Sequence, residues 1–501
     1  MNSSQLVARN ARKYPQAQAV IGFEGSLTFQ ELNDKVNALS NGLLERGIDK
    51  GDNVCLFMPN TFEFIITYFA VQRVGAVVIP INAKFTLDEV QYIVDHCEAK
   101  AIFAHEIIFS AVESIEKVPL KIKTGEHAQN WESFEQLLAL SPGKEVECNL
   151  TEDDYSTILY TSGTTGDPKG VLFSYRNILT VAQMIAVEME VKPDSKMLLM
   201  MPLTHSAPLH LFLMSATVVG AAVVITPTFT PDLLLKAVAT YRTTHFFGAP
   251  VAYLLTAQHP EIKNYDLSTM KWWVYGGAPL AKEQIDLIAE RFHTDRLTSV
   301  YGLTEAGPSG AIMLPEEHGE KTGSIGMRAP LHTELRIVDE HGQVIPAGEV
   351  GEIVLRGEGN MVGYYKNMAL TKETFNGDWL KTGDLARRDE EGYIWIVDRK
   401  KDVIISGGVN IYPKEIEDVM MKYPTIQEVA IIGLPHREWG ETVTAFFSAT
   451  EEVKSEELNR FLVDHLAKYK IPRSYHQVDM LSRNASGKIL KRVLKEGVEQ
   501  V

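Results

Sequence analysis

Short apolar runs alternate with helical patterns from about residue 50 to about residue 320 of the chain. The runs are rich in β-branched and aromatic residues, and amphipathic stretches such as residues 232–241 fall between them. Strands that alternate with helices along a chain are typical of parallel α/β sheets. The pattern therefore predicts an α/β fold, with strands at residues 54–58, 76–79, 101–104, 221–225 and 245–247.

Two longer apolar stretches, residues 62–81 and 211–225, could be taken for membrane spans. Arg73 and Gly75 interrupt the first stretch, and the second is shorter than the roughly 18 to 20 residues that cross a bilayer. Each stretch is better explained as a buried helix that runs into a strand. We expect the change to occur at Gly75 and at Gly220, and we expect no transmembrane segment.

The pattern changes twice in the second half of the chain. From residue 321 strands lie closer together, and a turn at residues 339–342 separates the runs 334–338 and 351–356, which fits a small antiparallel β-barrel or sheet. After residue 398 two amphipathic helices flank a pair of strands, which predicts a compact α+β unit. The marks of this unit are the helical positions Ile416, Val419, Met420 and Tyr423, strands at 428–432 and 442–448, and a helix with Leu458, Phe461, Leu462 and His465 that Ser455 caps.

These patterns divide the chain into two predicted domains. The first, residues 1–398, is expected to hold the parallel α/β sheets and the small antiparallel barrel. The second, residues 399–501, is expected to be the small α+β unit. A chain of 501 residues exceeds the roughly 250 to 300 residues of one core, so more than one domain is required.

The overall charge narrows the functional classes. The chain carries a formal net charge of −16, whereas nucleic acids and anionic membranes are bound mainly through clustered Lys and Arg. Neither is therefore expected as a partner. The first 14 residues show no export signal, and the three cysteines form no Cys-x-x-Cys pair, so we expect a cytoplasmic enzyme. Cys55 is assigned to the core, and His96 with Cys97 lacks the second ligand pair of a zinc site.

The most specific motif is the loop at residues 160–170, which reads Tyr-Thr-Ser-Gly-Thr-Thr-Gly-Asp-Pro-Lys-Gly. Its glycines permit conformations in which successive N–H groups face one anion, and Lys169 adds a positive charge. Apolar runs at 157–160 and 170–173 place the loop on a tight turn between two strands. It differs from a Walker A loop, where Gly precedes the Lys and Ser or Thr follows it. The motif predicts binding of ATP phosphates.

Four further segments accompany this loop. Residues 301–305 read Tyr-Gly-Leu-Thr-Glu, residues 381–384 read Lys-Thr-Gly-Asp, residues 398–408 run from Asp-Arg-Lys-Lys-Asp to Gly-Gly, and residues 484–488 read Asn-Ala-Ser-Gly-Lys. Together they resemble the adenylate-forming superfamily of acyl-CoA synthetases, peptide-synthetase adenylation domains and luciferases. The likeness covers essentially the whole chain. It implies a ligase that uses ATP, Mg²⁺ and CoA to convert a carboxylic acid first into acyl-AMP and then into a thioester.

The resemblance also implies roles for single residues at the nucleotide site. Lys169 would hold the β- and γ-phosphates, Thr304 would donate to the α-phosphate, and Glu305 would bind Mg²⁺, which prefers oxygen ligands. Asp384 would accept the ribose hydroxyls with support from Arg399. The nucleotide site implied in this way also contains Thr161, Ser162, Gly163, Thr164, Thr165, Gly166, Gly276, Gly277, Ala278, Pro279, Tyr301, Gly302 and Lys488. For Gly276 to Pro279, proposed to pack on adenine, a purely structural turn remains the alternative.

The same resemblance implies that the C-terminal domain is mobile and serves both half-reactions. Lys488 would bridge carboxylate and phosphate during adenylation. Rotation about Lys401 would then withdraw it and bring Gly407 and Gly408 to the CoA thiol arm. Trp439 matches a tryptophan near the CoA nucleotide in some relatives, and simple packing is its alternative.

The acid is expected to bind beside His205, which matches a position that orients the carboxylate. A buried, hydrogen-bonded histidine without that role is the alternative. The pocket would be lined by small or apolar residues and by no obvious Lys, Arg or carboxylate, and burying an unpaired second charge there would cost several kcal/mol. We therefore favour a medium- or long-chain fatty acid, with a benzoate- or cinnamate-type acid as the alternative. The predicted lining is His205, Ser206, Ala207, Phe247, Gly276 and Gly302.

Two other functions stay open at this point. A ligase that loads acyl-AMP onto a separate carrier protein would keep the same ATP site. A nucleotide-binding regulator without catalysis would be expected to lose charged groups, and Lys169, Glu305, Asp384, Arg399 and Lys488 are all present. The partners expected are therefore small molecules, with a homodimer left open.

Overall fold

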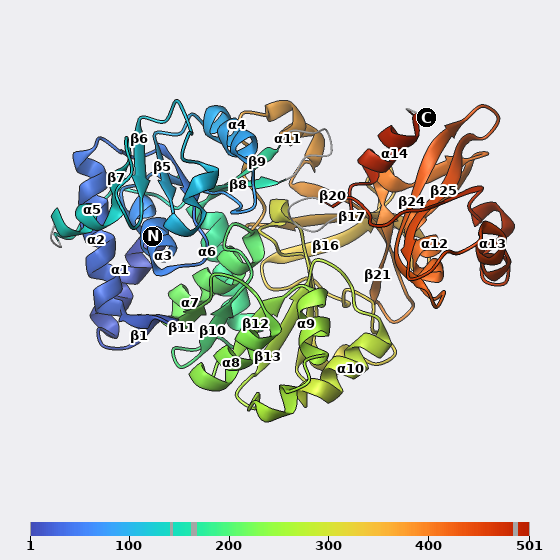
Figure 1. Ribbon diagram of the computed structural model, residues 1–501, viewed down its shortest axis with the longest axis horizontal. Coiled ribbons are helices and arrows are strands. Elements are labelled where there is room, and N and C mark those ends of the chain that lie inside the picture. Colours follow the sequence, from blue (N-terminus) through green and yellow to red (C-terminus); the bar gives the residue numbers. More distant parts are fainter. Residues whose placement is uncertain (1, 141–143, 162–167, 484–488, 500–501) are drawn as a thin grey trace. The chain divides into compact units, whose positions relative to one another are not determined.

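The computed structural model describes residues 2–140, 144–161, 168–483 and 489–499 (Figure 1). The chain forms two compact units, one of Met1–Leu335 with Leu355–Leu380 and one of Arg336–Val354 with Lys381–Val501. It passes from one unit to the other within β16 (Thr333–Val338), β17 (Val350–Gly357) and β20 (Trp379–Arg388). The domain boundary predicted after residue 398 lies inside the second unit. It therefore stays a prediction, namely that residues 399–501 move as one domain.

The first unit contains two eight-stranded sheets that are mainly parallel. The first has the order β15-β14-β13-β12-β10-β11-β1-β2, in which only the edge strands β2 and β15 run antiparallel to their neighbours. Its strands are β1 (Gln18–Gly22), β2 (Gly25–Thr28), β10 (Lys196–Leu199), β11 (Ala222–Ile225), β12 (His245–Gly248), β13 (Trp272–Gly276), β14 (Leu297–Tyr301) and β15 (Ala311–Met313).

The second sheet has the order β18-β9-β8-β4-β3-β5-β6-β7. Its antiparallel strands are gathered at one edge, where β9 pairs with both β8 and β18. The remaining pairs are parallel. Its strands are β3 (Asn53–Phe57), β4 (Val77–Pro80), β5 (Ala101–Ala104), β6 (Leu120–Lys123), β7 (Glu132–Ser133), β8 (Tyr155–Thr161), β9 (Lys169–Ser174) and β18 (Gly363–Tyr364). The predicted parallel α/β class and its five predicted strands are therefore confirmed.

Helices cover the faces of these sheets (Figure 1). Helices α1, α2 and α3 pack against one another. Almost every side of α3 carries apolar residues, which allows this helix to be buried. Left-handed glycines, Gly75 with φ 85° and Gly220 with φ 83°, follow the helices of the two long apolar stretches, as predicted. The helices are α1 (Ser3–Lys13), α2 (Phe29–Glu45), α3 (Phe62–Arg73), α4 (Leu87–Cys97), α5 (Phe134–Leu140), α6 (Tyr175–Glu188), α7 (Met214–Val219), α8 (Pro231–Tyr241), α9 (Pro250–Ala257), α10 (Lys282–Phe292) and α11 (Met368–Thr374).

Local sequence fixes where several of these helices begin. The side chains of Thr28 before α2 and Thr86 before α4 each accept a hydrogen bond from the backbone N–H of the third helical residue. The carboxylates of Glu31 and Glu89 in turn accept the backbone N–H of these two threonines. Such reciprocal caps satisfy N–H groups that the helix itself leaves open. In the part of the chain that the structure describes, none of the helices has both the length and the apolar character needed to span a bilayer.

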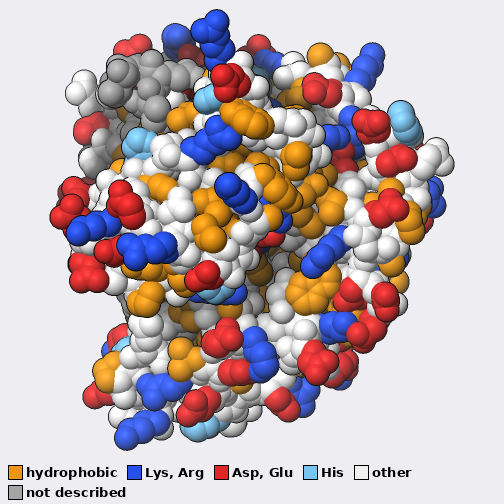
Figure 2. Space-filling model, turned by 90° about the vertical axis from the view of Figure 1, so that its right-hand side faces the viewer, with side chains coloured by type: hydrophobic (Ala, Val, Ile, Leu, Met, Phe, Trp, Pro, Cys, Tyr) orange, Lys and Arg blue, Asp and Glu red, His pale blue; other side chains and the backbone are white. Residues whose placement is uncertain are grey.

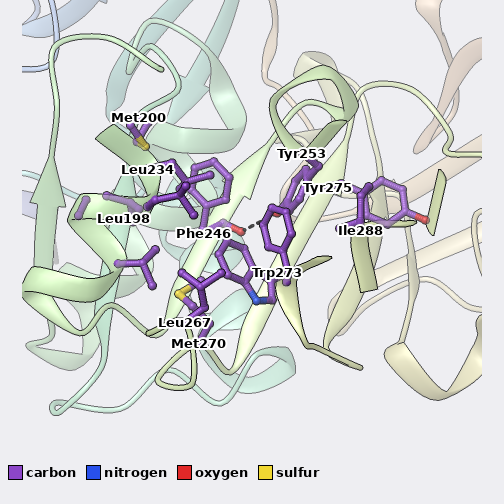
Figure 3. Packing of buried hydrophobic residues seen from close by; sticks show 14 of the residues in the cluster. Leu198, Met200, Leu234, Phe246, Tyr253, Leu267, Met270, Trp273, Tyr275 and Ile288 are labelled. Carbon is purple, nitrogen blue, oxygen red and sulfur yellow. Dashed lines mark hydrogen bonds between the residues drawn. The ribbon is translucent and has the colours of Figure 1, made fainter. Parts of the chain in front are cut away.

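The aromatic core of the first sheet is centred on Trp273 in β13 (Figure 3). The indole contacts Phe292 of α10 edge-on at 4.9 Å between ring centres, and it contacts Phe246 and Tyr253 at 6.1 Å. Tyr253 is also fully buried, and its hydroxyl donates to the Val274 carbonyl at 2.8 Å. These rings join two helices to the sheet through one well-packed cluster.

The second unit holds an α+β arrangement, as predicted. A five-stranded sheet has the order β23-β22-β25-β24, with β26 paired to β25. Its inner face packs against α12 and α13 through a cluster that includes Ile416, Phe447 and Leu462. The elements are β22 (Ile404–Ser406), β23 (Val409–Ile411), α12 (Pro413–Met420), β24 (Ile426–His436), β25 (Gly440–Ala449), α13 (Ser455–Val463), β26 (Ser474–Gln477) and α14 (Lys491–Glu499).

Another five-stranded sheet carries the three strands in which the chain changes unit. It has the order β16-β17-β20-β19, with β19 (Phe375–Asn376) and β21 (Ile394–Arg399) both antiparallel to β20. The predicted turn after β16 is present, since Gly342 N–H donates to the Asp339 carbonyl at 3.1 Å. The short antiparallel strands predicted for this region are thus confirmed.

The predicted cap of the last amphipathic helix is wrong. Lys454 occupies the capping position of α13 with an extended backbone, and Ser455 is already the first helical residue. No side chain caps this helix, and it ends at Val463, before His465. The acidic Glu456 and Glu457 in the first turn are present as predicted, and they favour the start of the helix through its dipole.

Acidic and basic side chains are interspersed on the face shown in Figure 2, with apolar side chains between them. This distribution differs from the concentrated basic stripe that nucleic-acid binding requires.

We predict that Trp273→Ala destabilises the first unit by about 3 to 5 kcal/mol, because the indole is 1% exposed and its loss leaves a large cavity. The measurement is the guanidinium denaturation midpoint, followed by tryptophan fluorescence and circular dichroism. Trp272→Ala is the matched control, since Trp272 is the preceding residue of β13 but is only partly buried. Equal losses in the two variants would contradict the central role of Trp273.

Candidate active site

The ends of the phosphate loop are held by an antiparallel strand pair. Thr161 at the end of β8 faces Lys169 at the start of β9, and Tyr160 faces Gly170. The predicted turn between two strands is therefore confirmed at its ends. Five predicted nucleotide-site residues, Ser162, Gly163, Thr164, Thr165 and Gly166, lie outside the described residues.

Lys169 and Glu305, distant in sequence, meet at one tyrosine. The Lys169 Nζ atom lies 5.7 Å from the centre of the Tyr364 ring, and the Tyr364 hydroxyl donates to Glu305 Oε1 at 2.8 Å. Burial and the nearby Glu305 charge raise the pKa of Tyr364 well above its usual value, so its hydroxyl remains a donor at neutral pH. Sequence reasoning missed Tyr364, because nothing in the Gly-Tyr-Tyr stretch at 363–365 indicates that this ring faces Glu305.

Thr304 and Glu305 lie in a short 3-10 turn, Thr304–Ala306. The Ser206 hydroxyl lies 3.4 Å from Thr304 Oγ1, so this turn also touches the predicted acid pocket. Gly302 precedes the turn, and a Cβ at that position would collide with the Pro308 carbonyl oxygen. The missing side chain of Gly302 is thus required by packing.

The residues present suit a magnesium ion held mainly by phosphate. Across the described ranges, no group of three or more His, Cys, Asp or Glu could enclose a metal. Mg²⁺ in nucleotide sites typically keeps waters and phosphate oxygens and takes only one or two protein carboxylates. Glu305 would hold the ion through the oxygen that Tyr364 leaves available, and the ion would neutralise phosphate charge.

The predicted adenine stretch follows β13 directly. A Cβ on Gly276 would lie 2.7 Å from the Val300 carbonyl, so this glycine is needed for packing against β14. Gly277 has φ 84° and open space around its missing side chain, and Ala278 and Pro279 are exposed. Gly277 therefore presents bare backbone that a flat ring could approach. Tyr301 ends the neighbouring strand β14.

His205 lies before a π-helical turn, Ala207–Leu213, that lines the predicted acid pocket. It is partly buried, and burial followed by the Lys84 charge lowers its pKa. The role of His205 in orienting a carboxylate stays a prediction, beside the alternative of a buried histidine without that role. Lys84 is exposed, and its charge acts on His205 although it is not among the predicted pocket residues. Sequence spacing gave no sign of it, because Lys84 comes from the loop after β4.

The structure also gives the surroundings of three other predicted pocket residues, Ser206, Ala207 and Phe247. Ser206 is 5% exposed, and Ala207 begins the π-helical turn. Phe247 of β12 lies 5.7 Å from Phe212 between ring centres, so the two rings pack together. Of the six predicted residues, His205 alone can titrate.

His210, in the same π-helical turn, is completely buried. Within the described part of the chain, both ring nitrogens lack a hydrogen-bond partner, and the ring packs edge-on against Phe173 at 4.9 Å. Burial lowers the pKa of His210 to about 3. The histidine is therefore neutral and costly to protonate.

In the second unit, the two predicted ribose residues form an ion pair. Asp384 and Arg399 are partners across β20 and β21, and Arg399 Nε lies 2.5 Å from Asp384 Oδ1. Asp384 is 4% exposed, while Arg399 is partly open to solvent. Asp398 accepts the N–H groups of Arg399 and Lys414 at 2.7 and 2.8 Å, and burial raises the pKa of this carboxyl. The predicted hinge residue Lys401 follows in an exposed 3-10 turn, Lys400–Asp402.

The predicted CoA-binding residues lie together in the second unit. Gly407 N–H donates to the Trp439 carbonyl at 2.8 Å, and a Cβ on Gly407 would come within 2.8 Å of the Trp439 ring. Arg473 lies over the same ring at 4.8 Å. Trp439 is nevertheless 42% exposed, so packing leaves one side of it accessible, and Gly408 faces open space.

Lys488 itself lies outside the described residues. The two ends of its segment are held together, because Arg483 and Ile489 form an antiparallel bridge and Leu490 N–H donates to the Ser482 carbonyl at 2.8 Å. The described residues on either side of this segment are therefore paired with each other directly before α14.

Comparison with known proteins decides the family. The AMP-binding enzyme family matches residues 7–365, and the AMP-binding enzyme C-terminal domain matches residues 415–488. The chain belongs to the AMP-binding enzymes.

Individual relatives agree with this assignment. A feruloyl-CoA synthase of Amycolatopsis sp is 34% identical, with 96% of each chain covered. The long-chain-fatty-acid–CoA ligase FadD13 of Mycobacterium tuberculosis (strain ATCC 25618 / H37Rv) is 31% identical over 99% of this chain and 98% of its own. Among solved structures, an ATP-bound RpMatB-BxBclM chimera, B3, has a TM-score of 0.89 at 29% identity, over 100% of this chain and 99% of the other.

These findings confirm the adenylate-forming superfamily and its acyl-CoA synthetase branch. Membership of this branch makes the protein an ATP-dependent acid–CoA ligase, with ATP and CoA as co-substrates and Mg²⁺ as the usual cation of the family. The identity of the acid is a separate question.

We predict that acid destabilises this AMP-binding enzyme partly through His210. In the unfolded chain a histidine has a pKa near 6.5, and the folded value is about 3, so between the two only the unfolded chain binds the proton. Stability therefore falls as the pH falls below about 6.5, by up to about 1.4 kcal/mol per pH unit. His245, whose pKa burial lowers to about 4, acts in the same direction.

The measurement is the urea denaturation midpoint between pH 7 and pH 4. His210→Leu should flatten this dependence, and His341→Gln, at an exposed histidine, is the control. If His210→Leu kept the full slope of the native protein, the buried ring would not be its cause.

Proposed function

We propose that the acid joined to CoA is a medium- or long-chain fatty acid. The single observation that carries this proposal is the composition of the predicted pocket lining. Of its six residues, His205, Ser206, Ala207, Phe247, Gly276 and Gly302, only His205 has a titratable side chain. A second carboxylate there would lose its hydration without gaining a buried counter-ion. Lys84 does not change this argument, because it is exposed and its charge remains hydrated.

The proposed first half-reaction is attack of the carboxylate on the α-phosphorus of ATP. Both reactants are anions, so the enzyme has to hold them together and disperse the phosphate charge. Lys169 would bind the β- and γ-phosphates, Thr304 the α-phosphate, and Glu305 the Mg²⁺ ion. The Ser206 to Thr304 contact supports this proposal, since it brings the acid pocket beside the phosphate site.

The second half-reaction would use the same acyl-AMP with CoA as the nucleophile. We propose that Lys488 serves adenylation, and that movement about Lys401 then replaces it with the Gly407–Gly408 loop. The bare backbone at Gly408 and the accessible face of Trp439 support a path for the pantetheine arm and the nucleotide of CoA.

A benzoate- or cinnamate-type acid is the second candidate. The 34% identity with a feruloyl-CoA synthase favours it, since the feruloyl group of that relative is aromatic. The apolar predicted pocket with the Phe212 and Phe247 rings suits a flat aromatic acid as well as an alkyl chain.

Acid-dependent exchange of labelled pyrophosphate into ATP tests the substrate class. We predict that fatty acids of about 8 to 16 carbons give the highest rates, aromatic monocarboxylates lower rates, and dicarboxylates rates at least about tenfold lower, because of the cost of an uncompensated buried charge. Preference for an aromatic acid would select the second candidate. Accumulation of acyl-AMP in the presence of CoA would instead favour a carrier protein as acceptor.

We predict that Lys488→Ala lowers adenylate formation by about 10²-fold or more, as expected for the loss of one preorganised charged donor. Thioester formation from supplied acyl-AMP should continue. The two half-reactions are measured separately, by pyrophosphate exchange and by CoA-dependent release of AMP. Lys495→Ala, in helix α14, is the control. Equal losses in both half-reactions would contradict the proposed division of labour.

A further inference from the structure

The segment before and through β18 connects two elements of the candidate nucleotide site. On one side, Met361 N–H donates to the Glu305 carbonyl at 2.8 Å. On the other side, Val362 N–H donates to Leu172 of β9 at 2.9 Å, and Tyr364 pairs with Val171 of the same strand. The backbone of residues 361–364 therefore links the Glu305 turn to the strand that begins with Lys169.

Close packing makes this link rigid. A Cβ on Gly307 would collide with the Gly359 carbonyl oxygen, so the turn after Glu305 and the start of the connecting segment touch backbone to backbone. At its other end, Tyr364 N–H donates to Thr371 Oγ1 at 2.9 Å, and Tyr365 N–H donates to the Gly170 carbonyl at 2.8 Å. The position of the Tyr364 side chain is thus set from both directions.

The Tyr364 side chain also links Glu305 to Lys169. Its hydroxyl donates to Glu305 Oε1 at 2.8 Å, which restricts the rotation of that carboxylate through one of its two oxygens. Its ring lies 5.7 Å from Lys169 Nζ, within the range of a cation–π contact. One side chain therefore contacts both the predicted phosphate ligand and the predicted cation ligand.

We propose that Tyr364 is a positioning residue for the Mg²⁺–ATP complex, which acts by orienting the Glu305 carboxylate toward the cation. The proposal rests on the proposed function, in which Glu305 binds Mg²⁺. Hydrogen-bond partners of metal ligands set the orientation and basicity of those ligands, and their loss typically costs 10- to 100-fold in metal affinity or activity.

The neighbouring tyrosine provides a matched control. Tyr365 follows directly and is also partly buried, but its hydroxyl accepts from Asn53 Nδ2 at 3.1 Å, and Asn53 lies in β3, an interior strand of the same sheet. Tyr365→Phe therefore removes a hydroxyl of the same kind from the adjacent position without touching Glu305. Any effect of Tyr364→Phe that Tyr365→Phe lacks belongs to the contact with the carboxylate.

The experiment measures ATP binding by calorimetry without any acid, so that no turnover occurs. Each titration is done with Mg²⁺ and again with EDTA. For Tyr364→Phe we expect the gain in ATP affinity that Mg²⁺ provides to fall by about tenfold or more. Affinity in EDTA should stay within about twofold, because the ring beside Lys169 is retained. Tyr365→Phe should match the native protein in both conditions.

A double-mutant cycle separates positioning from folding. In a Glu305→Gln background, Tyr364→Phe should have little further effect on the Mg²⁺ dependence, because the two residues act through one contact. Thermal unfolding of every variant is recorded alongside. Independent, additive effects of the two substitutions, or an unchanged Mg²⁺ dependence in Tyr364→Phe, would overturn the proposal.

Failure of the proposed function would give a different result. In that case the native protein itself would show no acid-dependent pyrophosphate exchange, or no dependence of ATP binding on Mg²⁺. A native protein that is normal in both assays, beside a Tyr364→Phe variant that is also normal, refutes only the positioning role.

Discussion

Strand β9 is hydrogen-bonded along both of its edges, and this constraint determines the geometry of the candidate active site. On one edge it pairs with β8, which brings Thr161 opposite Lys169 at the two ends of the phosphate loop. On the other edge it pairs with β18, which places Tyr364 beside Val171. A one-residue shift in the register of a strand would move its buried side chains to the opposite face of the sheet, and pairing on both edges opposes such a shift. The backbone position from which the Lys169 side chain extends is therefore fixed.

From that strand the connections extend to the remaining groups of the first unit. Tyr364 reaches Glu305, and the turn that contains Glu305 also holds Thr304, which meets Ser206 at the predicted acid pocket. The groups proposed for phosphate, cation and acid therefore form one connected series of contacts. Placing reacting groups on packed strands and short turns is how an enzyme limits the entropy lost when two anions are brought together.

Electrostatics in this region depends on burial more than on total charge. The chain carries a net charge of −16, yet the predicted acid pocket contains a single titratable residue, His205, whose pKa is lowered by burial. In the second unit, the buried Asp384 is paired with Arg399 at 2.5 Å, which leaves a carboxylate held in one orientation.

The sequence by itself determined the fold class and the family, and it supplied the candidate site residues as predictions, because these depend on local information. Alternating strands and helices predict parallel sheets, and the loop of residues 160–170 is a contiguous motif. Contacts between distant segments were decided only by the tertiary structure. Tyr364, 59 residues from Glu305, carries no local signal of its hydrogen bond, and the effect of the Lys84 charge on the pKa of His205 depends on how the chain folds. The cap of α13 was misplaced by one residue, since the backbone conformation at Lys454, and not residue type alone, fixes where a helix begins.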